Sequence, residues 1–139
     1  MKKNKVLLLI ITLAILIPLH SQARNKIRWM SFKNAFILSK KYKKPMMIYL
    51  YTKHCPYCRK LEKDIFQKTK IITKLNSQYY NVGIDGSQIN RFQKDLQYIY
   101  SKKASSMFNQ IVGRGGVPKT IFMNSKGEIL VSFPGYSNT

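Results

Sequence analysis

Acidic residues are scarce in this chain. Its 139 residues include 25 Lys+Arg but only 5 Asp+Glu, which gives a formal net charge of +20. Cysteine is also rare, and two cysteines cannot form a disulfide-rich scaffold or a four-cysteine zinc site. The 7 glycines and 5 prolines exclude collagen-like and linker-type chains. Because 45% of the residues are hydrophobic, the chain can nevertheless bury the core of one domain.

The positive charge is spread along nearly every segment. A nucleic-acid-binding protein usually concentrates basic residues on one face, with aromatic residues between them. The even spread favours the solvated surface of a very basic protein, and we expect no nucleic-acid partner. Attraction to an anionic membrane surface or to an acidic partner is the alternative.

The first 23 residues have the pattern of a secretory signal peptide. Three lysines precede an apolar run, Val6 to Ile17, and a small-x-small motif follows at Ser21 and Ala23. Twelve helical residues reach about 18 Å, well short of a hydrocarbon core of ~30 Å. We therefore expect export and cleavage after Ala23, with an uncleaved membrane anchor as the alternative. The mature domain would be residues 24–139.

Hydrophobic periodicity predicts alternating helices and strands in the mature chain. The predicted order is α-β-α-β-α-β-β, with two helical stretches between the first two strands and without repeats or internal linkers. Helices are expected over 29–43, from 56 to about 66, around 71–75 and over 89–101; strands are expected over 46–51, 79–85, 117–123 and 128–133.

Two cysteines form the most informative motif, Cys55-Pro56-Tyr57-Cys58. The motif follows a strand that reads as buried and begins a helix, which is the context of a redox-active pair. The free N–H groups at a helix start favour the thiolate of Cys55. Half of a zinc site and a structural disulfide are the alternatives. Zinc would need two further ligands, and the chain has only two histidines.

A second motif, Gly116-Val117-Pro118, precedes the third predicted strand. A proline at a strand start fits only where its missing N–H faces no partner. A cis Val117–Pro118 bond at this place would present the Val117 backbone to a substrate chain.

With these motifs the chain resembles the thioredoxin-fold disulfide oxidoreductases, particularly the exported thioredoxin-like proteins of bacterial envelopes. The resemblance runs from about residue 29 to 136. It depends on the two motifs above and on four further stretches: Lys44-Pro45, Leu61-Glu62-Lys63-Asp64-Ile65-Phe66, Val82-Gly83-Ile84-Asp85 and Asn124-Ser125-Lys126-Gly127-Glu128.

The resemblance implies an α/β thioredoxin fold, with a central mixed sheet flanked by helices. It implies that Cys55 attacks, that Cys58 resolves and that Pro118 is the cis-proline beside them. Val117, Pro118 and Tyr57 would contact the substrate. No metal or other cofactor is implied. The implied partners are protein thiols and disulfides and a recycling redox protein, for which a membrane protein is one candidate. The implied location is the periplasm, and we expect a monomer.

The chain departs from the thioredoxin pattern at three places. Tyr49 occupies the strand position where many thioredoxins carry a buried acid, and we expect Glu62 and Asp64 to lie on the helix surface in contact with water. His54 replaces the tryptophan that often precedes the first cysteine. The family usually ends with a helix after the last strand, whereas this sequence ends six residues past Phe133. We expect either that the 29–43 helix covers that face of the sheet or that the sequence is cut short. The direction of electron flow stays open, and a binding or assembly module with a structural cysteine pair is the alternative function.

Overall fold

The computed structural model describes residues 25–113 and 115–136; the predicted signal peptide, residues 1–23, lies outside this range. Its strands form a single mixed sheet with the order β1-β3-β2-β4-β5. The five strands are β1 (Trp29–Met30), β2 (Met46–Tyr51), β3 (Tyr80–Asp85), β4 (Lys119–Met123) and β5 (Ile129–Pro134). The first three strands are mutually parallel, while β4 runs antiparallel to both β2 and β5.

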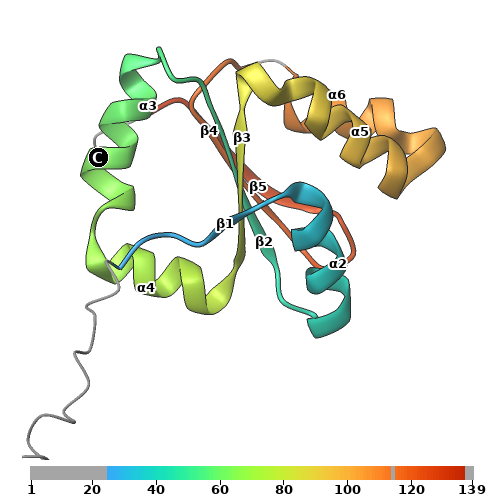
Figure 1. The fold of residues 1–139 in the computed structure, drawn as a ribbon, viewed down its shortest axis with the longest axis horizontal. Helices are drawn as coiled ribbons and strands as arrows, with labels where there is room; N and C mark the ends of the chain where they lie inside the picture. Colours follow the sequence, from blue (N-terminus) through green and yellow to red (C-terminus); the bar gives the residue numbers. More distant parts are fainter. Residues whose placement is uncertain (1–24, 114, 137–139) are drawn as a thin grey trace, which may run out of the picture.

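Helices cover both faces of this sheet (Figure 1). They are α2 (Phe32–Tyr42), α3 (Pro56–Leu61), the π-helical turn η1 (Glu62–Phe66), α4 (Thr69–Gln78), α5 (Ile89–Tyr100) and α6 (Ala104–Ile111), with short 3-10 turns η2 (Gly86–Gln88) and η3 (Ser101–Lys103). One core cluster joins α2, α5 and α6 to one face of the sheet, and a second cluster joins α3 and α4 to the other. This is the thioredoxin fold, as predicted.

The central strand β2 is covered on both faces, which explains why its sequence is one continuous apolar run. Five of its six residues are buried, and the side chains alternate between the two clusters. Met46, Ile48 and Leu50 face α2 and α5, whereas Met47 and Tyr49 face α3 and α4. This alternation places Tyr49 beneath the helix that carries the cysteines.

Two elements differ from the prediction. Trp29 and Met30 were expected in a helix, but they form the edge strand β1 and pair with Asn81 and Val82. The helix starts only at Phe32, where the Ser31 side chain accepts a hydrogen bond from Asn34 N. The second difference is α6, which the prediction left without an assignment.

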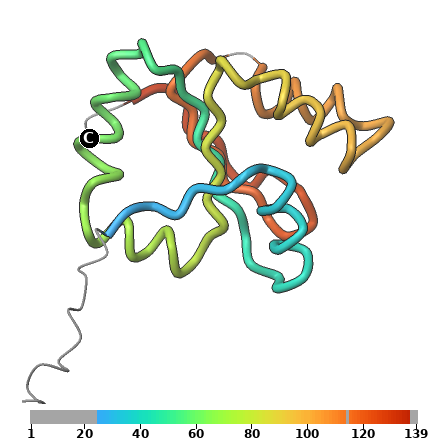
Figure 2. Tube along the Cα trace, in the orientation of Figure 1, coloured from blue at the N-terminus to red at the C-terminus, as the bar shows by residue number. Residues whose placement is uncertain are grey.

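The segment leading into β1 is attached to α4. Asn76 accepts a hydrogen bond from Arg28 N at 2.9 Å, and its amide donates to the Lys26 carbonyl at 2.8 Å. In Figure 2 this segment, in blue, runs past α4 to reach the sheet. A side-chain amide thus substitutes for a longer strand ladder, which explains why periodicity did not reveal β1.

Candidate functional site

The two cysteines lie at the start of α3, directly after β2. Cys55 is the N-cap residue, and Pro56 occupies the first helical turn, where its missing N–H is tolerated. Cys55 and Cys58 form a disulfide with their Cα atoms 5.2 Å apart. Cys58 is buried, with 1% of its surface exposed, while Cys55 is only partly buried. The outer sulfur is therefore the one that a substrate can approach.

Backbone N–H groups at the helix start face the outer sulfur. Cys58 N donates to Cys55 Sγ across 3.1 Å. Such a bond favours a thiolate over a thiol, because the charged acceptor gains more from it. The geometry therefore suits Cys55 to act as the nucleophile once the disulfide is reduced.

The loop before β4 lies against the cysteine pair. The Val117–Pro118 peptide bond is cis, and Pro118 is fully buried. The carbonyl oxygen of Val117 is 3.7 Å from Cys55 Sγ. Tyr57, between the two cysteines, is 63% exposed. The structure thus brings four of the five predicted site residues, Cys55, Cys58, Val117 and Pro118, into one place, with Tyr57 at its exposed margin.

A buried lysine that the sequence reasoning missed supports this loop. Lys119 Nζ donates to the carbonyls of Ile111 and Gly113, at 3.2 and 3.1 Å. Burial lowers the pKa of Lys119. Lys119 is the first residue of β4, directly after Val117 and Pro118. Its side chain thereby attaches the start of β4 to the end of α6. A lysine at a strand start reads as a surface residue, so the sequence offered no signal for this role.

Tyr49 links the buried cysteine to a carboxylate. Its hydroxyl is 3.3 Å from the Cys58 carbonyl oxygen and 3.2 Å from Glu62 Oε1. Burial, followed by the Glu62 charge, holds the pKa of Tyr49 well above its usual value, so the phenol keeps its proton and donates it. Glu62 is half-buried and bonded to Tyr49, so it differs from the expected surface residue whose only role is contact with water.

Asp64 also differs from the expectation, because it accepts a hydrogen bond of 2.6 Å from the Tyr136 hydroxyl. Both carboxylates stand in the π-helical turn η1, directly after α3. The spacing held a signal for Glu62. It is four residues after Cys58, and residues at i and i+4 share one helix face.

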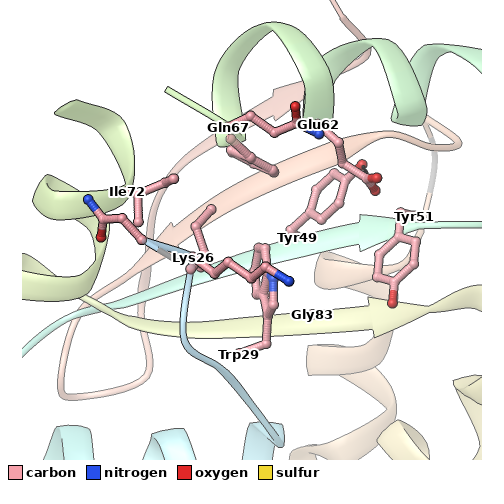
Figure 3. A pocket seen from close by; sticks show the side chains of 11 residues that line it. Lys26, Trp29, Tyr49, Tyr51, Glu62, Gln67, Ile72 and Gly83 are labelled. Atoms are coloured by element: carbon pink, nitrogen blue, oxygen red, sulfur yellow. Dashed lines mark hydrogen bonds between the residues drawn. The ribbon is translucent and has the colours of Figure 1, made fainter. Parts of the chain in front are cut away.

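A cavity of about 610 Å³ opens beside Tyr49 (Figure 3). Aromatic rings form much of its wall: the Tyr49 ring stacks on Tyr51 at 5.1 Å and lies 5.9 Å from Trp29. The Trp29 ring lies directly against Gly83, where a Cβ would be 3.4 Å from it. Glu62 reaches the same cavity, next to the Tyr49 hydroxyl (Figure 3). The carboxylate thus has a path to solvent that the buried Cys58 lacks.

Exposed basic residues flank the two cysteines in the chain. Lys53, His54, Arg59 and Lys60 are all exposed. The Arg59 guanidinium donates to the Lys53 carbonyl at 3.2 Å, which holds it beside the loop that leads to Cys55.

In residues 25–113 and 115–136, no three or more His, Cys, Asp and Glu side chains are grouped as a metal site would need. Over the same described ranges, no helix is both long and apolar enough to cross a membrane.

Comparison with known proteins identifies the class. The model of the thioredoxin-like domain family matches residues 32–139, and the chain belongs to this family. In this thioredoxin fold, a CxxC disulfide lies at the start of the helix that follows β2. This arrangement defines a thiol:disulfide oxidoreductase. No curated protein matches the chain significantly.

Several solved structures share the fold. A structure described as DsbH oxidoreductase has 20% identity and a TM-score of 0.60, covering 88% of this chain and 83% of that one. A putative disulphide-isomerase from Bacteroides thetaiotaomicron has 20% identity and a TM-score of 0.57, covering 86% and 88%. A thioredoxin from Thermus thermophilus has 18% identity and a TM-score of 0.57, covering 79% and 76%.

Proposed function

We propose that this protein is a disulfide oxidoreductase of the bacterial envelope that acts on protein clients through Cys55 and Cys58. The observation that carries the proposal is the geometry of the pair. The outer sulfur is accessible, accepts a backbone N–H and lies 3.7 Å from the Val117 carbonyl oxygen, while the inner sulfur is buried.

The reaction is dithiol–disulfide exchange. The Cys55 thiolate attacks one sulfur of a client disulfide; a Cys55–client S–S bond forms, the client S–S bond breaks, and the second client sulfur leaves as a thiolate. Cys58, as its thiolate, then attacks Cys55 Sγ and displaces the first client sulfur. The client gains two electrons, and the protein is left with the Cys55–Cys58 disulfide. The oxidising direction is the reverse.

The backbone around Val117 would position the client. In our proposal a client chain lies extended beside Val117 and Pro118, with its sulfur next to Cys55 and the exposed Tyr57 ring against it. A dithiol or disulfide partner recycles the protein. The direction of net flow then depends on that partner.

The pattern of the N-terminal sequence supports an envelope location. Three lysines, a short apolar run and the Ser21-x-Ala23 motif are the features of a cleaved secretory signal. Sequencing the N-terminus of the protein purified from the periplasmic fraction tests this part. A mature chain that starts at Arg24 supports it, and an intact Met1 in a membrane fraction contradicts cleavage.

An insulin disulfide-reduction assay tests the activity. Reduced wild-type protein should reduce insulin, and Cys55→Ser should abolish the reaction. Cys58→Ala should accumulate a mixed disulfide through Cys55. A wild-type protein that stays inactive although its thiols are reduced would favour the alternative, a binding or assembly module with a structural cysteine pair.

A further inference from the structure

The five carboxylates of this protein are all engaged by neutral hydrogen-bond donors. Glu62 accepts from the Tyr49 hydroxyl, Asp64 from the Tyr136 hydroxyl and Glu128 from the Asn124 amide. Asp85 and Asp95 accept from the backbone N–H groups of Ser87 and Lys33. The acids are thus held by contacts within the fold. The Ser87 N–H is the main cause that lowers the pKa of Asp85, and Lys53 and His54 nearby add to this effect, so the charge of Lys53 is partly balanced.

The basic residues near the cysteines lie on both sides of the place where a client would bind. On one side, Lys53 and His54 form the loop into Cys55, and the Arg59 guanidinium is bonded to that loop. On the other side, Lys60 Nζ is 5.3 Å from the centre of the Tyr136 ring.

The second side belongs to the Pro118 loop. Gly135 N, next to Tyr136 in the chain, donates to the Pro118 carbonyl at 2.7 Å. A chain lying between Cys55 and Val117 would therefore pass between Lys53 and Arg59 on one side and Lys60 on the other, where Tyr136 also bonds to Asp64. The backbone edge at Val117 is uncharged and would set no preference of its own.

We propose that this protein prefers disulfides whose flanking residues are acidic. The inference rests on the proposed function and adds its substrate class. A polypeptide is favoured over a membrane surface because these cations surround a sulfur that must touch its client, and a lipid headgroup offers no disulfide to exchange.

The expected size of the preference is modest. Two exposed ion pairs between client acids and these cations correspond to a preference of about twofold to thirtyfold. The preference should vanish at ~1 M salt, where the Debye length falls to ~3 Å.

The test uses the reduced full-length protein and two synthetic peptides with one internal disulfide each. The peptides are identical except that one carries Asp and Glu on both sides of the disulfide and the other carries Asn and Gln. The ratio of their second-order reduction rates is measured at low and high salt. Bis(2-hydroxyethyl) disulfide, which is small and neutral, reports the exchange reaction itself.

Two double variants with the same loss of charge separate a local from a global effect. Lys53→Gln with Lys60→Gln removes one cation from each side of the cysteines. Lys102→Gln with Lys103→Gln removes two exposed cations in η3, which lies at the opposite side of the molecule from α3 (Figure 1). We expect the first double variant to lose the acidic preference and the second to keep it.

Failure of the inference is distinct from failure of the proposed function. Turnover of the neutral disulfide with equal peptide rates overturns the acidic preference and leaves the exchange activity standing. An equal loss in both double variants also overturns it, because net charge alone would then explain the effect. The proposal is also overturned if the two peptides react at equal rates and the protein binds phosphatidylglycerol vesicles only when Lys53 and Lys60 are present. The cations would then serve to bind a membrane. No turnover of the neutral disulfide contradicts the proposed function itself.

Discussion

The hydroxyl of Tyr49 lies 3.2 Å from the carboxylate of Glu62, on the side of α3 that faces the sheet. Tyr49 stands where many thioredoxins carry an acid, so the strand supplies no carboxylate beneath Cys58. The helix supplies one instead, and the phenol connects it to the Cys58 carbonyl at 3.3 Å. The cavity beside Tyr49 gives Glu62 access to solvent. Glu62 therefore lies one hydroxyl away from the backbone of the buried cysteine and is itself open to water.

Glu62→Gln should slow the step in which Cys58 resolves a mixed disulfide, because Cys58 must lose its proton to attack. We expect a slowing of about tenfold, below the ~10²–10⁴ of a directly placed base, because Glu62 is bonded through Tyr49 to the Cys58 backbone and not to the Cys58 sulfur. The measurement is the release of thionitrobenzoate from its mixed disulfide with Cys55, followed over a pH series. The loss should shrink as pH rises and Cys58 ionises unaided.

Two variants make this prediction specific. Tyr49→Phe keeps the ring in the aromatic wall but breaks the link, so it should slow the same step. Glu128→Gln removes an equal charge in the hairpin turn, where Glu128 bonds to Asn124, and should leave the rate unchanged. A Glu62→Gln protein with a wild-type pH profile would show that Glu62 only packs against Tyr49.

The two cysteines should differ sharply in reactivity after reduction. Cys55 is partly exposed and Cys58 has 1% of its surface exposed, so iodoacetamide near neutral pH should modify Cys55 much faster. Peptide mass spectrometry over a time course gives the two rates. Unfolding in urea is the control and should bring the rates together. Equal rates in the folded protein would contradict the assignment of Cys55 as the attacking thiol.

The reduction potential should lie above that of thioredoxin. The Cys58 N–H bond to Cys55 Sγ and the surrounding cations stabilise the thiolate, and a stabilised thiolate favours the reduced form. We expect a value of about −230 to −180 mV, against about −270 mV for thioredoxin. Equilibration with glutathione buffers measures it.

The local cations can be tested separately from the helix start. The Lys53→Gln with Lys60→Gln protein should have a lower potential than wild type, and the distant Lys102→Gln with Lys103→Gln protein should not. If the reduction potential of the wild-type protein lies at or below that of thioredoxin, neither the helix start nor the local cations control the potential.

The sequence predicted the parts of the fold that depend on local pattern. The buried run of β2, the Cys55–Cys58 motif at a helix start and the β4–β5 hairpin follow from periodicity, spacing and turn residues. It did not predict β1, because two residues cannot show a period and Asn76 of α4 positions the segment. The sequence reasoning also missed the bond from Tyr49 to Glu62. That contact joins a strand to a π-helical turn and depends on how α3 packs on the sheet.

Tyr100 provides a stability test away from the cysteines. Its hydroxyl is buried without a hydrogen-bond partner among the described residues, and its ring packs edge-on to Phe36 at 5.3 Å. An unpaired buried hydroxyl costs about 1–3 kcal/mol. Tyr100→Phe keeps the ring and removes that cost, so it should raise the free energy of unfolding by about 1 kcal/mol in urea titrations near pH 8.

The same hydroxyl makes stability depend on pH. Burial raises the pKa of Tyr100 to about 12 in the folded protein, whereas the unfolded chain titrates near 10. Between these values the unfolded state loses the proton first, so unfolding becomes more favourable as pH rises from about 10 to 12. Tyr49 acts in the same direction, and Tyr100→Phe should therefore reduce this loss without removing it. Tyr98→Phe, on the same helix but 68% exposed, is the matched control and should follow wild type. A Tyr100→Phe protein with lower stability near pH 8 and an unchanged pH slope would show that the hydroxyl is hydrogen-bonded in solution.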